Sequence, residues 1–216
     1  MSWRAVIFDL DGTLLDTIED IAAAANHALA RRGFPPCDLS DYRRFVGEGA
    51  RVLISRVLPE SARGEESVRA SLADFMEEYA RSWYVRTLPY QGIAAMLEDC
   101  AQKKIAMGVL SNKPHELTVK CVEAAFGHKR FKIVLGQRPQ VPRKPDPAGA
   151  FEAARSLGVE PRETLFVGDS AIDMQTARAA GMRAVGALWG YRDREELLAA
   201  GAQELAAHPT DILRLI

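Results

Sequence analysis

Two aspartates stand two residues apart directly after a short apolar run near the start of the chain. The segment AVIFDLDGTLLDT places Asp9 and Asp11 on either side of Leu10. Burying a carboxylate is costly unless it is paired with a cation or bound to a metal. Alternate residues of an extended segment point to the same side, so both carboxylates face the same way. The pair therefore predicts a site for chemistry at the end of a buried strand.

Other polar residues follow later apolar runs in the same manner. They are Ser111 and Asn112 in GVLSNKP, Lys144 in QVPRKPDP, and Asp169 and Asp173 in FVGDSAIDMQTARAAGM. In open parallel sheets, ligands bind outside the carboxyl ends of the strands. We therefore expect these acids, the lysine, the hydroxyl and the amide to converge at one edge of a sheet.

The elements that would position these residues alternate between short apolar runs and helical patterns. Strands are predicted at Ala5–Leu10, Ile105–Leu110, Lys132–Leu135, Thr164–Val167 and Ala184–Leu188, and helices at Ile93–Lys103, Pro114–Ala125, Pro147–Leu157 and Ile172–Ala180. This alternation predicts an α/β fold, a doubly wound (Rossmann-like) parallel sheet with helices on both faces. The C-terminal GAQELAAHPTDILRLI lacks a clear apolar strand, so a last edge strand is expected to be short or absent.

Residues 17–88 interrupt the alternation with helical patterns only. Helices are predicted at Ile18–Arg32, Glu48–Leu58 and Glu65–Val85, and Thr17 with Asp20 resembles a capping box. The chain is therefore expected to consist of an α/β core, residues 1–16 plus 89–216, and an all-helical domain, residues 17–88, inserted after the first strand.

Composition narrows the class of protein. The chain has 216 residues and a net charge of −1, which favours neither nucleic acid nor an anionic membrane as a partner. Its three cysteines are widely spaced and form no CxxC pair, which argues against a disulfide framework or a zinc site. No signal peptide or membrane-spanning stretch is recognisable. We expect a cytoplasmic protein that is a monomer or a homodimer.

Four motifs in this order, DLDGT, SN, KPDP and GDSAID, closely resemble those of the haloacid dehalogenase-like hydrolase superfamily. The resemblance covers essentially the whole chain. Finer features resemble its phosphoglycolate phosphatase-like branch: DLDGTLLDTIEDIAAAANHAL, FVGEGARVL, SNKP, and AAGM followed by WGYR.

The resemblance implies a Mg²⁺-dependent reaction on a phosphate ester. Asp9 would attack phosphorus and also bind the metal, with Asp169 as the second metal carboxylate. Asp11 would offer its backbone carbonyl to the metal and use its side chain as general acid, then as general base. Asp173 would hold a metal-bound water or orient a ligand.

The remaining candidates would bind the phosphoryl group and the substrate. Gly12 allows close approach of its backbone N–H, Ser111 and Asn112 would donate hydrogen bonds, and Lys144 would balance negative charge. The helical insert resembles the family's mobile cap, which would exclude water and select substrates by size. There, Gly47 would let the backbone approach a ligand and Arg51 would meet a substrate carboxylate or second anion.

Several activities are compatible with these motifs. The leading hypothesis is hydrolysis of a small phosphorylated metabolite, with 2-phosphoglycolate first among the candidates. A phosphotransferase resembling β-phosphoglucomutase, or a phosphatase of another sugar phosphate or a nucleotide, remains an alternative. Dehalogenation is disfavoured because those relatives lack the second aspartate of the first motif, and a signalling receiver domain is disfavoured because receivers carry no such insert.

Overall fold

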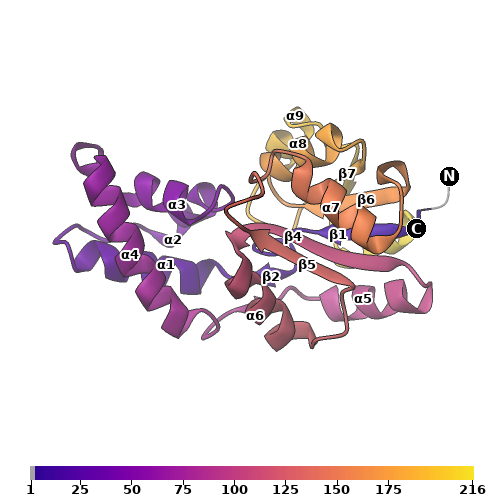
Figure 1. The fold of residues 1–216 in the computed structure, drawn as a ribbon, viewed down its shortest axis with the longest axis horizontal. Helices are drawn as coiled ribbons and strands as arrows, with labels where there is room; N and C mark the ends of the chain where they lie inside the picture. The colour runs from indigo at the N-terminus through magenta and orange to yellow at the C-terminus, as the bar shows by residue number, and fades with distance from the viewer. Residues whose placement is uncertain (1–2) are drawn as a thin grey trace. The chain divides into compact units, whose positions relative to one another are not determined.

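The computed structural model describes residues 3–216, which form two compact units. One unit comprises residues 3–16 and Leu88–Ile216, and the other comprises Thr17–Thr87. The insert predicted from the sequence, residues 17–88, begins at the same residue as the second unit and ends one residue after it. Both units appear in Figure 1.

A parallel sheet forms the centre of the first unit, as the sequence predicts, and it has six strands, one more than the five predicted segments. Its order is β5-β4-β1-β6-β7-β8, with bounds β1 Ala5–Phe8, β4 Ala106–Pro114, β5 Ile133–Gln137, β6 Thr164–Gly168, β7 Arg183–Ala187 and β8 Glu204–Ala206. All four residues of β1 are buried. A continuous apolar run suits a central parallel strand because helices cover both of its faces.

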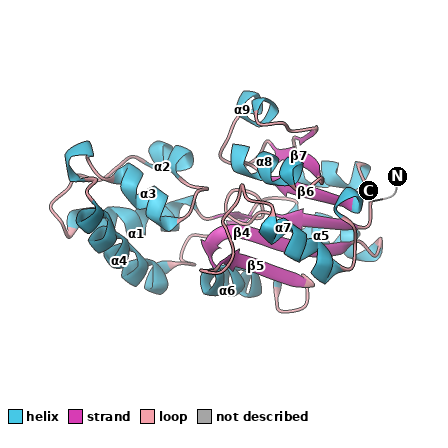
Figure 2. Cartoon of the chain, turned by 45° about the horizontal axis from the view of Figure 1, so that its top comes forward, coloured by secondary structure: helices cyan, strands magenta, loops and turns pink. Residues whose placement is uncertain are grey.

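Helices on both faces complete the layered α/β arrangement, visible in Figure 2. They are α5 Ile93–Gln102, α6 His115–Phe126, α7 Ala148–Leu157, α8 Ala171–Ala179 and α9 Arg194–Ala199. Helices α7 and α8 bury small residues, among them Ala153 and Ala177, in one apolar cluster with Ile7 and Phe166 of the sheet. Figure 1 shows α7 and α8 on one side of the sheet, with α5 and α6 on the other.

One difference from the predicted strands affects the site. Strand β4 continues through Pro114 with an irregular register after Leu110, so Ser111 and Asn112 lie within the strand rather than after it. The last edge strand, β8, has only three residues, as expected, and a 3-10 helix, Pro209–Arg214, follows it.

The insert leaves and rejoins the first unit through a short antiparallel ribbon of β2 (Leu15–Asp16) and β3 (Leu88–Pro89). Leu15 is paired with Pro89 and Asp16 with Leu88. The two ends of a 71-residue excursion, Thr17–Thr87, therefore meet at one place. This pairing allows β1 to remain central although the chain departs directly after it.

The second unit contains helices only, in agreement with the sequence pattern. They are α1 Ile18–Ala30, α2 Leu39–Phe45, α3 Ala50–Val57 and α4 Glu65–Ser82, with a 3-10 turn at Glu60–Ala62. Helix α2, which lacks a long apolar pattern, was not predicted. Helix α1 packs against α4. Nowhere in residues 3–216 is a helix both long and apolar enough to cross a membrane.

The capping box predicted at Thr17 is wrong. The Thr17 side chain makes no capping hydrogen bond at the start of α1. Asp20 instead accepts hydrogen bonds from the backbone N–H groups of Val85, Arg86 and Thr87 and from the Thr87 hydroxyl, at 2.7–3.0 Å. Asp20 thus ties the start of the insert to its end.

Candidate active site

The carboxyl end of β1 places Asp9 at the centre of a group of buried polar residues. Its N–H donates to the Val167 carbonyl oxygen at 2.9 Å, which continues the pairing of β1 with β6. The side chain is 8% exposed. Asp9 therefore lies beside the end of β6, where the GDSAID motif begins.

Three carboxyl groups meet at this point: Asp9 follows β1, Asp169 follows β6, and Asp173 lies in the first turn of α8. Asp9, Asp169 and Asp173 each present an oxygen, and these three oxygens lie within 4.8 Å of one another. All three residues are buried. The convergence expected from the sequence is thus observed for these acids.

Lys144 provides a buried cation next to two of the acids. Its Nζ lies 2.8 Å from Oδ1 of Asp9 and 2.6 Å from Oδ1 of Asp173. Burial alone would lower the lysine's pKa, but the carboxylates of Asp173 and Asp9 outweigh it and raise that pKa above its ordinary value. Lys144 therefore remains an ammonium group.

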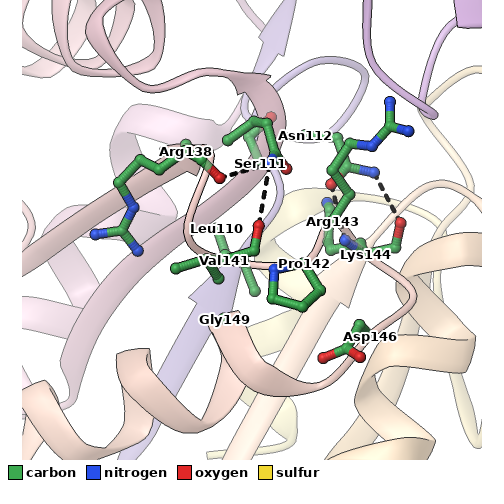
Figure 3. A pocket seen from close by; sticks show the side chains of 12 residues that line it. Leu110, Ser111, Asn112, Arg138, Val141, Pro142, Arg143, Lys144, Asp146 and Gly149 are labelled. Carbon is green, nitrogen blue, oxygen red and sulfur yellow. Dashed lines mark hydrogen bonds between the residues drawn. The ribbon is translucent and has the colours of Figure 1, made fainter.

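Asn112 holds the backbone of Lys144 through both ends of its side-chain amide. Oδ1 of Asn112 accepts from the Lys144 N–H at 2.9 Å, and Nδ2 donates to the Lys144 carbonyl oxygen at 3.1 Å. Figure 3 shows this pair at the side of a small pocket that Ser111 also lines. The geometry supports a role for Asn112 in positioning Lys144, and its predicted donation to a phosphoryl group stays a prediction.

The electrostatics of the carboxylate cluster favour a cation. Burial, followed by repulsion from Asp173, raises the pKa of Asp9 well above its ordinary value, although Lys144 opposes this. Burial and the same Asp173 raise the pKa of Asp169. Oδ1 of Asp9 also lacks a hydrogen bond of good geometry, although it is ion-paired with Lys144.

These features fit a divalent cation with hard oxygen ligands. Three carboxyl groups face one ammonium group, so the cluster has an excess of negative charge when all three are ionised, and a bound cation would balance it. Mg²⁺ binds through few protein carboxylates and keeps its other positions for water and substrate oxygens. The donor set of this cluster consists of oxygens alone, which is what Mg²⁺ prefers.

Asp169 is held rigidly by residues that sequence reasoning did not single out. Its Oδ1 accepts from the Thr13 hydroxyl at 2.9 Å, and its Oδ2 accepts from the Tyr191 N–H at 2.9 Å. A Cβ at Gly190 would lie 2.2 Å from Cβ of Asp169, so only glycine fits there. The signal was present in WGYR, which supported the resemblance but received no role.

Both carboxylate oxygens of Asp173 contact neighbouring residues. Oδ2 accepts from the N–H and the hydroxyl of Ser170, at 3.1 and 2.6 Å, which closes a capping box at the start of α8. Oδ1 contacts Lys144. This arrangement supports an orienting role for Asp173 toward Lys144.

Asp11 has a buried partner that the sequence analysis missed. Nζ of Lys113 lies 2.9 Å from Oδ1 of Asp11. Lys113 follows the SN motif, between the predicted strand Ile105–Leu110 and the predicted helix Pro114–Ala125, and the sequence pattern gave it no role. Because β4 continues past that motif, Lys113 instead lies buried in the strand.

Four other residues were predicted for the site, two in the sheet unit and two in the helical unit. The Ser111 hydroxyl oxygen accepts from the Lys113 N–H at 3.3 Å. Gly12 has a φ of 89°, and a Cβ there would lie 2.3 Å from Oδ2 of Asp169, so both conformation and space require glycine. In the helical unit, Gly47 also has a positive φ, and Arg51 is ion-paired with Glu65. The predicted contact of Gly47 and Arg51 with substrate stays a prediction.

Comparison with known proteins agrees with this geometry. A family model described as haloacid dehalogenase-like hydrolase matches residues 6–187. Phosphoglycolate phosphatase 1 of Pseudomonas aeruginosa is 38% identical over 192 residues, covering 87% of this chain and 70% of the relative. The phosphoglycolate phosphatase of Xylella fastidiosa is 34% identical over 193 residues, covering 89% of this chain and 83% of the relative.

Solved structures extend the likeness to the whole fold. The crystal structure of a protein assigned as a phosphoglycolate phosphatase from Lactobacillus delbrueckii subsp. bulgaricus matches with a TM-score of 0.95 at 30% identity. The match covers 100% of this chain and 99% of the other. The chain belongs to the haloacid dehalogenase-like hydrolases, in their phosphoglycolate phosphatase-like branch, and is a phosphoric monoester hydrolase.

Proposed function

We propose that this protein is a Mg²⁺-dependent phosphatase of small phosphomonoesters that works through an aspartyl-phosphate intermediate, with 2-phosphoglycolate as the first candidate substrate. The observation that carries the proposal is the meeting of Asp9, Asp169 and Asp173 within 4.8 Å, with Lys144 in contact with Asp9. The names of the relatives support the choice of substrate.

In the first step, a carboxylate oxygen of Asp9 forms a bond to phosphorus as the bond from phosphorus to the ester oxygen breaks. The departing oxygen takes a proton from the Asp11 carboxyl and leaves as an alcohol. Asp9 then carries the phosphoryl group, and Asp11 is a carboxylate.

In the second step, Asp11 takes a proton from a water molecule, whose oxygen forms a new bond to phosphorus. The bond between phosphorus and the Asp9 oxygen breaks, which releases inorganic phosphate and restores the Asp9 carboxylate. Asp11 is protonated again, so the cycle returns to its starting state.

The side chains of Asp9 and Asp169 and the backbone carbonyl of Asp11 would hold Mg²⁺. The ion supplies positive charge that lowers the repulsion between the Asp9 carboxylate and the phosphoryl oxygens. Asp173 supports the site through its contact with Lys144.

The phosphoryl oxygens need further donors that do not react. The ammonium group of Lys144, which contacts Asp9, supports this role, and Ser111 is proposed to add a hydroxyl. The N–H of Gly12 was the other predicted donor, but it donates to the Leu15 carbonyl oxygen at 2.8 Å. Gly47 and Arg51 are proposed to contact the remainder of the substrate.

The test is a screen of the purified protein against 2-phosphoglycolate, sugar phosphates including a sugar 1-phosphate, and nucleotides. We expect release of phosphate with Mg²⁺, none with EDTA, and none from the Asp9→Asn variant under either condition. Glycolate and phosphate should appear in equal amounts from 2-phosphoglycolate. Turnover by Asp9→Asn would contradict the mechanism, and conversion of the sugar 1-phosphate to an isomer without phosphate release would identify a phosphotransferase instead.

We further propose that the protein works in the cytoplasm as a monomer or a homodimer. Cys37, Cys100 and Cys121 form no disulfide in residues 3–216. Reduced thiols are typical of a reducing compartment.

A further inference from the structure

Lys113 is a buried lysine to which the steps above assign no role. Its side chain is 3% exposed, and that of its partner Asp11 is 11% exposed. An ammonium group withdrawn from water is stable only with a well-placed opposite charge. The contact of 2.9 Å between Nζ and Oδ1 of Asp11 meets this requirement.

The main chain of Lys113 is fixed on both sides, so its side chain starts from a defined position. The Lys113 N–H donates to the Ser111 hydroxyl oxygen at 3.3 Å, and the Lys113 carbonyl oxygen accepts from the Thr118 hydroxyl of α6 at 3.1 Å. Residues 111–113 belong to β4, the neighbour of β1 in the sheet. Lys113 therefore reaches across from the adjacent strand.

Different lysines thus contact the two aspartates of the first motif. Lys144 contacts Asp9 and Asp173, whereas Lys113 contacts Asp11. A carboxyl group that transfers a proton must hold a fixed direction toward the departing oxygen, since small displacements reduce the rate strongly. The hydrogen bond from Nζ of Lys113 to Oδ1 of Asp11 limits rotation of the Asp11 side chain, and a proton carried on the other carboxyl oxygen, Oδ2, leaves this hydrogen bond in place.

We propose that Lys113 is a positioning residue that orients the Asp11 carboxyl group for proton transfer to the leaving alcohol. This inference rests on the proposed function, because it requires Asp11 to act as the general acid. It concerns one step only, the breaking of the ester bond.

The dependence on the leaving group separates this role from others. An aliphatic alcohol is a poor leaving group and needs the proton, whereas p-nitrophenolate leaves without one. The kcat/KM of both esters reports formation of the phosphorylated enzyme. The ratio of the two kcat/KM values from one sample does not depend on how much of the protein is folded.

The experiment compares Lys113→Met with the unaltered protein on p-nitrophenyl phosphate and on 2-phosphoglycolate, or on the aliphatic ester that turns over fastest in the screen. We expect kcat/KM to fall about 100-fold for the aliphatic ester and only a few-fold for p-nitrophenyl phosphate. Asp11→Asn should show the same selective loss. The double variant should lose little more, because the two residues act as a unit.

Two further variants sharpen the result. Lys113→Arg should recover part of the aliphatic activity because it keeps the positive charge. Lys132→Met is the matched control, since Nζ of Lys132 donates to the Leu157 carbonyl oxygen, away from the carboxylate cluster. This control should leave the ratio unchanged.

Equal losses on both esters would overturn the proposal and indicate that Lys113 binds the phosphoryl group or serves folding alone. No loss on the aliphatic ester would overturn it as well. The proposed function is tested separately by Asp9→Asn, which should abolish hydrolysis of both esters. Hydrolysis by that variant would contradict the proposed function, whatever the result at Lys113.

Discussion

Two buried aspartates, one in each unit, differ in how their charge is satisfied. Asp20 in the helical unit is 3% exposed and accepts hydrogen bonds from three consecutive N–H groups and a hydroxyl. Asp9 in the sheet unit is 6% exposed, and its Oδ1 has an ion pair but no well-directed hydrogen bond. The two carboxyl groups are therefore similarly buried, but only that of Asp20 is surrounded by hydrogen-bond donors.

The difference separates a structural carboxylate, Asp20, from one proposed to react, Asp9. The donors around Asp20 leave its oxygens engaged, so it closes the insert by joining residue 20 to residues 85–87. Asp9 instead shares its surroundings with Asp169 and Asp173 and retains an oxygen able to bind a cation or phosphorus. The degree of burial does not separate the two aspartates, whereas the number of hydrogen-bond donors around each carboxyl group does.

The largest expected effect is on turnover in the Asp9→Asn variant. The amide is a poor nucleophile, so kcat should fall by about 10³-fold or more, while the melting temperature stays the same or rises because a buried charge is removed. Steady-state assays and thermal unfolding of the same preparation check both parts. A variant with lower stability and unchanged turnover per folded molecule would place Asp9 with Asp20 as a structural residue.

Asp20→Ala should behave in the opposite way. Leaving several buried donors without an acceptor is expected to lower the free energy of unfolding by about 3 kcal/mol. Urea unfolding measures this loss, and Asp20→Asn should lose less because it keeps one acceptor oxygen. The comparison fails if Asp20→Ala unfolds at the urea concentration of the unaltered protein.

The pH dependence of Mg²⁺ binding should follow the raised pKa values. Burial raises the pKa of Asp9 to about 8 and that of Asp169 to about 7, above the value near 4 of an unfolded chain. The neutral forms therefore stabilise the cation-free protein at low pH, and this stability is lost progressively as pH rises from about 4 to about 8. Mg²⁺ needs the charged forms, so its stabilisation should increase over the same range.

Thermal unfolding with Mg²⁺ and with EDTA, at about pH 6 and about pH 8.5, tests this dependence. Mg²⁺ at about 100 times its dissociation constant should add about 2.7 kcal/mol, and the shift in melting temperature should be larger at the higher pH. Asp169→Asn is the control and should reduce the shift. A shift that is equal at both pH values argues against a carboxylate site with raised pKa values.

The smallest effect is expected in the helical unit, at Arg51. If this residue meets the carboxylate of 2-phosphoglycolate, Arg51→Ala should raise KM for that substrate about tenfold and leave KM for p-nitrophenyl phosphate unchanged. Glu65→Ala removes the ion-pair partner but keeps the cation, so its KM should stay the same. Stability should change by about 0.5 kcal/mol or less in both variants, because the pair is exposed. Unchanged KM in Arg51→Ala would identify an ordinary surface residue.

The sheet unit was more predictable than the helical one. Runs such as 5–8 and 165–167 are apolar throughout, which is characteristic of strands covered on both faces. Helix α2, in contrast, buries only Tyr42 and has no such pattern. Asp20 formed a plausible local cap in sequence but found its partners 65–67 residues away. Local patterns cannot reveal competition from distant donors.

The sequence by itself determined the fold class, the family and the acids at the strand ends, because residue type and spacing along one chain carry that information. Only the tertiary structure decided which cation faces which carboxylate: Lys144 with Asp9 and Asp173, and Lys113 with Asp11. It also decided that Gly190 and Tyr191 support Asp169. These contacts join residues 21 to 135 positions apart, and charge pairing at 3 Å depends on how the strands are ordered in the sheet, which no local spacing specifies.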